Sequence, residues 1–269
     1  KRKRDERCSE IFEIQASALA RRMEHTNAKK LIVGVSGGLD STLALLASEK
    51  AVRKMGKNSS ALLAVTMPGF GTSARTLKNA CELVKILNAE LRTIDIKEIC
   101  KKHLEDIGQT PLKHNLVFEN AQSRERTQIL MDIANAEEGI VVGTGDLSEI
   151  ARGWSTFNGD HISMYAVNCG IPKTLIRYIV QWVSDNSQSQ LSQILIDILD
   201  TPVSPELLPR KKDGNMSQET EKIIGPYDLH DFFLYHTVKY GADPAKILHI
   251  AKIAFNGRYE EKYIKNTFK

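Results

Sequence analysis

A short glycine-rich segment follows the first strongly apolar run of the chain, and its residue types suit phosphate binding. The run 31–35 is typical of a buried strand, and the residues after the turn suit a helix. Gly37 and Gly38 stand in the turn between them, where a phosphate could approach the backbone closely. Backbone N–H groups of such a turn can converge on an anion, and a helix N-terminus adds roughly half a positive charge. This segment therefore predicts an anion site.

Polar side chains in the same segment extend this chemistry. Ser36, Ser41 and Thr42 offer hydroxyl donors, and Asp40 offers a carboxylate that could hold Mg²⁺ beside bound phosphates. The P-loop of many nucleotide-binding proteins requires a lysine directly after its second conserved glycine, and this segment has none. The segment is therefore not a P-loop, and a strand–glycine–helix turn can also be a plain tight connection.

Strands and helices must alternate if this turn is to be presented at the edge of a sheet. Short apolar runs predict strands at 31–35, 61–66, 91–96 and 139–143. Helical periodicity predicts helices at 8–24, 41–55, 75–88, 97–106 and 119–136. This alternation predicts an α/β fold with a doubly wound parallel sheet. Ligands bind such sheets at the carboxyl ends of the strands, where 67–71 and 144–149 would join the glycine-rich turn.

The rest of the chain is predicted to be helical. Helical patterns cover 173–185, 189–199, 228–240 and 243–255. The segment 201–227 between them is rich in proline and polar residues, so we expect a mobile loop there. We interpret 1–269 as a single domain in which residues 1–7 form a solvated basic tail.

Composition narrows the class of protein. The chain has 269 residues, 42% of them hydrophobic and 26% charged, which is ordinary for a globular protein with a sizeable core. A net charge of +4 suits anionic small substrates and does not by itself indicate nucleic acid. The four cysteines form no CxxC pair, and there is no signal peptide or membrane-spanning apolar run. We therefore expect a reduced, cytoplasmic protein without nucleic-acid or membrane partners.

Four strings in the chain carry a resemblance to a known family. The string Ser36-Gly-Gly-Leu-Asp-Ser41 resembles the pyrophosphate-binding loop of the ATP pyrophosphatases, whose fold is adenine nucleotide alpha-hydrolase-like. Residues 65–72, residues 142–149, and residues 153–160 continuing to 167–174 resemble NAD synthetases, above all the synthetase half of the glutamine-dependent type. The resemblance extends over nearly the whole chain.

The resemblance implies an ATP-dependent amidation. The nicotinate carboxylate of deamido-NAD would attack the α-phosphate of ATP, giving an acyl adenylate and pyrophosphate. Ammonia would then attack the adenylate to give NAD and AMP. Such a reaction depends on positioning and on charge stabilisation around two anionic partners.

Matching motifs then imply roles for individual residues. ATP would contact the loop formed by Gly34, Val35, Ser36, Gly37, Gly38, Leu39, Asp40 and Ser41. It would also contact Thr144, Lys173 and Ser204, the last within the predicted mobile loop. Asp40 and Glu149 would hold Mg²⁺, and Asp40 and Lys173 are the predicted catalytic residues. Without the flanking motif, Glu149 would be interpreted as an exposed carboxylate at a helix start.

The dinucleotide would be bound by residues from two other segments. Arg124, on the polar face of the predicted helix 119–136, matches a substrate-binding arginine of the family. Asp160 matches a substrate-binding aspartate, and Phe157 could supply a flat surface for a ring. From composition alone, Arg124 would belong to a solvated face, Asp160 to a turn and Phe157 to packing.

The family resemblance also implies expectations about binding partners and about the two ends of the chain. The resemblance implies a homodimer. Nothing in the chain resembles the glutaminase domain of the glutamine-dependent enzymes, so we expect ammonia, free or from a separate piece, as the nitrogen donor. Since the chain does not begin with Met and stops before the family's basic C-terminal tail, we expect an excised domain or a processed product, missing part of the substrate site.

Two other functions compete with this interpretation. One is another ATP pyrophosphatase, such as a GMP-synthetase-like amidotransferase or a tRNA-modifying adenylase; the paired cysteines of the thiolating kinds are missing here. The other is a nucleotide-binding module without turnover. Release of pyrophosphate would separate the enzymes from the module.

Overall fold

The computed structural model describes residues 2–209 and 220–268. Within these residues, five strands form one sheet in the order β3 (Glu90–Thr93), β2 (Leu62–Thr66), β1 (Leu31–Gly34), β4 (Ile140–Gly143) and β5 (Tyr165–Ala166). Every neighbouring pair is parallel, so the predicted parallel sheet is confirmed. The strand β5 was not predicted because it has two residues, too few for a periodic pattern.

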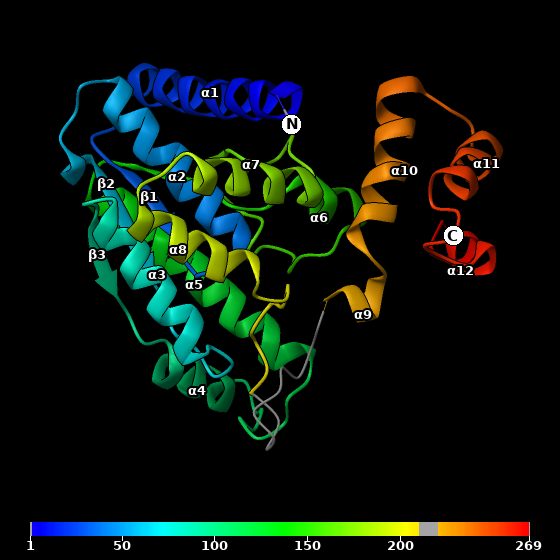
Figure 1. The fold of residues 1–269 in the computed structure, drawn as a ribbon. Helices are drawn as coiled ribbons and strands as arrows, with labels where there is room; N and C mark the ends of the chain where they lie inside the picture. Colours follow the sequence, from blue (N-terminus) through cyan, green and yellow to red (C-terminus); the bar gives the residue numbers. More distant parts are fainter. Residues whose placement is uncertain (1, 210–219, 269) are drawn as a thin grey trace.

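Helices cover both faces of the sheet (Figure 1). One face packs against α1 (Arg2–His25), α2 (Leu39–Lys54), α3 (Ala74–Ile86), α7 (Lys173–Asp185) and α8 (Ser189–Leu199). The other packs against α4 (Lys97–Asp106) and α5 (Leu116–Ala136). Side chains of β1 alternate between these layers: Leu31 and Val33 join the first core, and Ile32 joins the second. The doubly wound α/β architecture is therefore confirmed.

The C-terminal helices form a separate cluster at the edge of this layered body (Figure 1). The short helix α9 (Thr220–Ile224) leads into α10 (Tyr227–Tyr240), α11 (Pro244–Ala254) and α12 (Glu261–Phe268). These last three share a small core that includes Phe233, Ile247 and Phe255. Among these last three helices, α10 contacts the main body through α7 and through the short helix α6 (Leu147–Arg152). None of the described helices has the length and hydropathy needed to span a bilayer.

Some predicted boundaries were wrong. Residues 2–7, expected in a solvated tail, belong to α1, where an Arg4 nitrogen lies 4.0 Å from an Asp185 oxygen at the end of α7. In the predicted loop 201–227, residues 201–209 have no regular structure and 220–224 form α9. The remaining part of that predicted loop, 210–219, lies outside the described residues.

Candidate active site

Starting from β1, the chain adds β2 and β3 on one side of this strand and then adds β4 and β5 on its other side. The switch point of the sheet therefore lies between β1 and β4, which are neighbours. Leu31 pairs with Ile140 and Val33 with Val142, so both strands end at the same edge of the sheet. The helices α2 and α6 follow these two strands. In open parallel sheets this switch point is where ligands bind. The loops after β1 and β4 therefore form the candidate site.

The loop after β1 has a backbone that requires glycine. Gly37 has a φ of +82°, and a Cβ on it would lie 2.1 Å from the carbonyl oxygen of Thr76. Gly38 follows as the N-cap residue of α2. The Ser41 hydroxyl donates to the Gly38 carbonyl at 3.0 Å and lies 3.2 Å from the Ser36 hydroxyl. The loop thus gathers hydroxyl groups and a helix N-terminus at one point, as predicted for an anion site.

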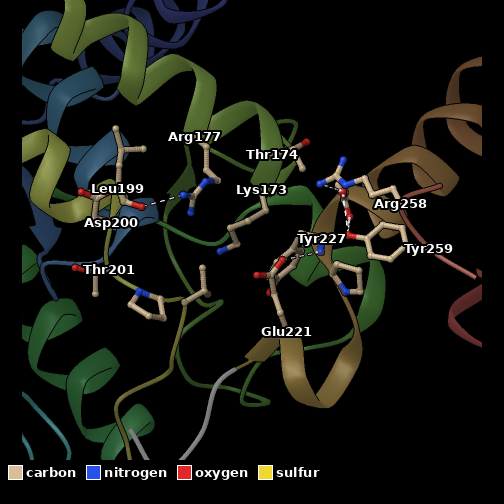
Figure 2. Close-up of a pocket in the computed structure, with 14 residues that line it drawn as sticks. Lys173, Thr174, Arg177, Leu199, Asp200, Thr201, Glu221, Tyr227, Arg258 and Tyr259 are labelled. Carbon is tan, nitrogen blue, oxygen red and sulfur yellow. Dashed lines mark hydrogen bonds and ion pairs between the residues drawn. The ribbon is translucent and has the colours of Figure 1, made fainter. Parts of the chain in front are cut away.

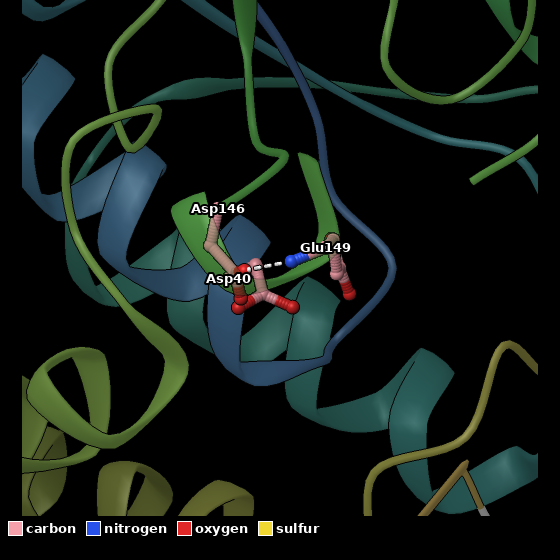
Figure 3. A group of neighbouring side chains, drawn as sticks. All are labelled: Asp40, Asp146 and Glu149. Carbon is pink, nitrogen blue, oxygen red and sulfur yellow. Dashed lines mark hydrogen bonds between the residues drawn. The ribbon is translucent and has the colours of Figure 1, made fainter. Parts of the chain in front are cut away.

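Three carboxylates meet beside this loop (Figure 3). Asp40 comes from the first turn of α2, whereas Asp146 and Glu149 come from the start of α6. One oxygen of each lies within 4.8 Å of the others. Asp146 also caps α6, accepting a 2.8 Å hydrogen bond from the Glu149 backbone N–H. Asp146 was not among the predicted site residues, although its place just after a strand, like that of Asp40, was a usable signal.

Lys173, the first residue of α7, places its ammonium group among these carboxylates. Its Nζ lies 2.6 Å from Asp40 Oδ2, 2.7 Å from Asp146 Oδ2 and 2.9 Å from Glu149 Oε1. The side chain is 1% exposed. The structure therefore brings Lys173 to Asp40 and Glu149, the two carboxylates that were expected to share Mg²⁺.

Burial and crowding shift the protonation of this cluster. Burial raises the pKa of Glu149 to about 8, and the neighbouring Asp40 charge adds to the effect. Burial raises the pKa of Asp146 to about 6, although the Lys173 ammonium opposes this. Burial disfavours the charge on Lys173 as well, but the carboxylates together hold its pKa well above the ordinary value. When every carboxylate is ionised, the cluster therefore carries more negative charge than the Lys173 ammonium can neutralise.

The cluster fits a divalent cation. Three carboxylates against one ammonium leave two negative charges uncompensated (3 − 1 = 2) when all four groups are ionised. The Oδ1 atom of Asp40 is buried and has no hydrogen-bond partner within residues 2–209 and 220–268. Carboxylate oxygens are the ligands that Mg²⁺ prefers, and it retains room for waters and phosphate oxygens. Asp40 and Glu149 could therefore hold Mg²⁺, with Asp146 as a further candidate ligand.

A buried amide connects the two site loops. The Asn168 side-chain amide donates to the carbonyl oxygens of Asp40 at 3.0 Å and Thr144 at 3.1 Å. Gln15 of α1 donates in turn to the Asn168 oxygen at 3.0 Å. This series of hydrogen bonds holds Thr144, a predicted ATP contact, next to the Asp40 backbone. Neither amide was predicted, but Gln15 on the apolar face of the first helix was a visible irregularity.

The predicted substrate residues gather in a second place. Arg124 of α5 donates from Nε to the Phe157 carbonyl oxygen at 3.1 Å, so the helix and the loop 153–164 meet there. The Phe157 ring is 74% exposed. Asp160 accepts a 2.7 Å hydrogen bond from the Thr156 backbone N–H, which shapes the turn of this loop. The exposed ring and the guanidinium group thus lie on adjoining surface.

A pocket of about 560 Å³ lies beside the cluster, between α7 and α10 (Figure 2). Lys173 and Arg177 line it from α7, and Tyr227 lines it from α10. Tyr227 is 3% exposed, its hydroxyl has no hydrogen-bond partner in the described part of the chain, and its ring centre is 5.4 Å from Lys173 Nζ. Ser204 follows the lining residue Val203, and its hydroxyl accepts a local 3.3 Å hydrogen bond from the Glu206 backbone. The structure thus leaves the predicted ATP role of Ser204 untested.

Comparisons with known proteins show what the chain as a whole is similar to. The family model for NAD synthase matches residues 11–267. A curated glutamine-dependent NAD(+) synthetase from Mycobacterium leprae is 41% identical over 247 residues, which cover 89% of this chain and 36% of that protein. The chain therefore spans about a third of the length of this relative and of its Mycobacterium bovis counterpart.

Solved structures share the fold. A glutamine-dependent NAD(+) synthetase from Cytophaga hutchinsonii superposes with a TM-score of 0.76 at 17% identity, covering 97% of this chain and 48% of that one. An NMN synthetase from Francisella tularensis superposes with a TM-score of 0.71 at 22% identity, covering 95% of each chain. At these identities, the two superpositions show that the fold is shared, and they do not by themselves assign an activity.

Proposed function

Because the chain belongs to the NAD synthase family, we propose that it amidates deamido-NAD to NAD at the expense of ATP. The observation that carries the proposal is the convergence of Asp40, Glu149 and Lys173 at the carboxyl ends of β1 and β4, directly beside the glycine-rich loop. Both reacting partners are anions, and this edge of the sheet supplies a cation, a helix N-terminus and a set of hydroxyl donors.

In the first step, a carboxylate oxygen of the nicotinate ring forms a bond to the α-phosphorus of ATP. The bond from that phosphorus to the bridging oxygen of the β-phosphate breaks, and pyrophosphate leaves. We assign the β- and γ-phosphates to the loop Gly34–Ser41, where Gly37 allows close backbone approach. The Lys173 ammonium would stabilise the charge that develops on the α-phosphate.

The acidic residues have a complementary role. Asp40 and Glu149 would hold Mg²⁺, which supplies charge stabilisation for the triphosphate when bound. Asp146 keeps α6 in place by capping it, so that Glu149 faces Asp40. Thr144 would contact ATP from the other loop, and Asn168 keeps that loop next to Asp40.

In the second step, ammonia attacks the carbonyl carbon of the adenylate. The new carbon–nitrogen bond forms, the carbon–oxygen bond to phosphate breaks, AMP leaves, and a proton from nitrogen passes to solvent. We propose ammonia itself as the donor for this chain, either free or delivered from glutamine by a separate piece; the curated relative from Mycobacterium leprae is named as glutamine-dependent.

The dinucleotide would lie along α5 and the loop that follows α6. Arg124 has further N–H donors besides the one that contacts Phe157, and a planar guanidinium suits a carboxylate or phosphate. Phe157 offers an exposed ring surface for stacking, and Asp160 offers hydrogen-bond acceptors. We keep Ser204 as a proposed ATP contact at the edge of the pocket.

We also propose that residues 1–269 act as one amide-forming domain and that two copies associate. Leu112 and Leu116, near the start of α5, are 85% and 70% exposed, and a second copy is the partner we propose for them. All four cysteines are free, which suits the reducing cytoplasm proposed as the location.

Substrate-dependent release of pyrophosphate tests the proposal. The chain is incubated with ATP and Mg²⁺, and pyrophosphate is measured after adding deamido-NAD, nicotinate mononucleotide or a xanthine nucleotide. We expect release with deamido-NAD above the two controls. Release with another acceptor alone would indicate a different ATP pyrophosphatase, and ATP binding without release would indicate a nucleotide-binding module.

A further inference from the structure

The helix α7 begins at Lys173, and its own sequence leaves the first turn uncapped. The residue at the N-cap position is Pro172, which has no side-chain oxygen to accept from the first amide groups of the helix. The first N–H groups of a helix have no partner within the helix, and leaving them unpaired inside a protein is costly. Because Lys173 is buried, these amides must find acceptors elsewhere in the fold.

Two distant side chains supply these acceptors. The Thr174 N–H donates to Asp231 Oδ2 at 2.8 Å, and the Lys173 N–H donates to the Ser148 hydroxyl oxygen at 2.9 Å. The Ser148 hydroxyl donates in turn to Asp231 Oδ1 at 2.5 Å. Ser148 is 0% exposed and Asp231 is 7% exposed, so solvent does not compete strongly for these bonds. Both Asp231 oxygens are thus used to hold protein groups.

Two of the three elements that meet here carry members of the cluster of Lys173 and its carboxylates. Ser148 stands in α6 directly before Glu149, and Lys173 stands at the start of α7. Asp231 belongs to α10, in the C-terminal cluster of helices, and is 57 positions from Thr174 in the sequence. One carboxylate from α10 therefore ties the helix that carries the lysine to the helix that carries two of its acidic partners.

We infer that Asp231 is a positioning residue, which sets the distance between Lys173 and the Asp146–Glu149 pair by accepting from both Ser148 and the Thr174 backbone. This inference rests on the proposed function for its catalytic consequence. The Lys173 ammonium has contacts of 2.6 to 2.9 Å with three carboxylates, so a small shift of the first turn of α7 changes all of them. A displacement of about 1 Å can cost on the order of a hundredfold in rate.

The matched control is Asp243, another aspartate that caps a helix in the same C-terminal cluster. Asp243 accepts from the Lys246 N–H at 3.0 Å and caps α11, its own helix. Asp231→Ala and Asp243→Ala therefore both remove a carboxylate cap, but only the first one removes a connection to α7. Asp231→Asn is the conservative variant, since its amide oxygen can accept from Thr174 while its amide nitrogen donates to Ser148.

The experiment measures two quantities on the full chain, below the melting temperature of every variant. Hydrogen exchange of the peptide that covers the first turn of α7 reports on geometry and needs no turnover. Deamido-NAD-dependent release of pyrophosphate reports on function. For Asp231→Ala we expect faster exchange in that peptide and a kcat lowered by about ten- to a hundredfold, with the KM for deamido-NAD within about twofold of wild type.

The controls distinguish positioning from general destabilisation. Asp243→Ala should leave both quantities at their wild-type values. Asp231→Asn should recover most of the rate that Asp231→Ala loses. The double variant Ser148→Ala with Asp231→Ala should lose little more of the rate than either change alone, because both changes break the same connection. Unchanged exchange and kcat in Asp231→Ala, or an equal loss in Asp243→Ala, would overturn the inference. If the wild-type chain releases no pyrophosphate, the proposed function fails, and the exchange measurement alone decides whether Asp231 holds α7.

Discussion

The Lys173 ammonium nitrogen lies 2.6 Å from Oδ2 of Asp40, although the two residues are 133 positions apart in the sequence. Asp40 is presented by the loop after β1, and Lys173 by the start of α7, so this ion pair closes the site across the switch point of the sheet. A cation is thus already part of the acidic cluster in the structure. The ammonium and a divalent ion would share the same carboxylates, which leads to the first prediction.

Replacing the lysine should make the protein depend on a metal ion for stability. Lys173→Met removes the positive charge but keeps a long apolar stem, and it leaves buried carboxylates without their partner. Removing one member of a buried ion pair costs about 3–5 kcal/mol. We expect a lower Tm in EDTA and a larger Mg²⁺-induced rise in Tm than in wild type. Equal Mg²⁺-induced shifts in both proteins, measured by calorimetry, would contradict the prediction that Lys173 and a divalent ion compete for these carboxylates.

The raised pKa of Glu149 predicts a specific pH dependence of stability. Its pKa is about 8 in the folded protein and near its ordinary value of 4.5 in the unfolded chain. Between these values the folded state holds a proton that the unfolded state has lost, so the stability from this group declines as pH rises from 4.5 to 8. Without metal, the Tm advantage of Glu149→Gln over wild type should therefore grow from pH 5 to pH 8 and then level off. A constant difference across that range contradicts the assignment.

Asp146 is predicted to have two separable roles. Asp146→Ala removes the cap of α6, which should cost about 1 kcal/mol, and also removes a carboxylate from the cluster. Asp146→Asn keeps an oxygen that can accept from the Glu149 N–H. We expect the alanine variant to lose stability and the asparagine variant to keep it. Both should lower the rate of pyrophosphate release by about a hundredfold, the scale typical of losing a preorganised charged group. If Asp146→Asn releases pyrophosphate at the wild-type rate, the role of Asp146 is to cap α6, and its charge does not contribute to the reaction.

The two loop glycines should differ in their tolerance of a side chain. Gly37→Ala forces a Cβ to 2.1 Å from the Thr76 carbonyl at a φ of +82°, which should cost more than about 1 kcal/mol and disturb ATP binding. Gly38→Ala meets only the Ser36 hydroxyl, at 3.2 Å, and its φ is −88°. We therefore expect a clear fall in Tm for the first variant and a much smaller one for the second. Equal changes would mean that the loop is not held against α3.

Much of the site could be predicted from the sequence because its residues stand next to strand ends. The apolar runs that form β1 and β4 are local signals, and Asp40 and Glu149 follow them within a few residues. Parallel strands bring such positions to one edge. The assignment of Glu149 itself came from the family motif, since without that motif Glu149 would be interpreted as an exposed carboxylate at a helix start. The position of Lys173 came from the motif around it, since a lysine after a proline has no local signal of its own.

Residues whose role depends on long-range pairing could not be predicted. Asp231 looks like an ordinary polar residue of an amphipathic helix, and its partners Ser148 and Thr174 lie 83 and 57 positions away. The same applies to Gln15, which reaches Asn168 across 153 positions. The helix α6 and the strand β5 have six and two residues, too few to show a period. Packing between elements decided each of these features.

The most direct test of the account is the formation of NAD from isotopically labelled ammonium by the 269-residue chain. The chain is incubated with ATP, Mg²⁺, deamido-NAD and ¹⁵N-ammonium, with ¹⁵N-amide glutamine as the parallel nitrogen source, and products are analysed by mass spectrometry. We predict NAD that carries one ¹⁵N atom from ammonium, formed in equal amounts with AMP, and no labelled NAD from glutamine. AMP and pyrophosphate without labelled NAD, or no consumption of ATP at all, would contradict the proposed amidation.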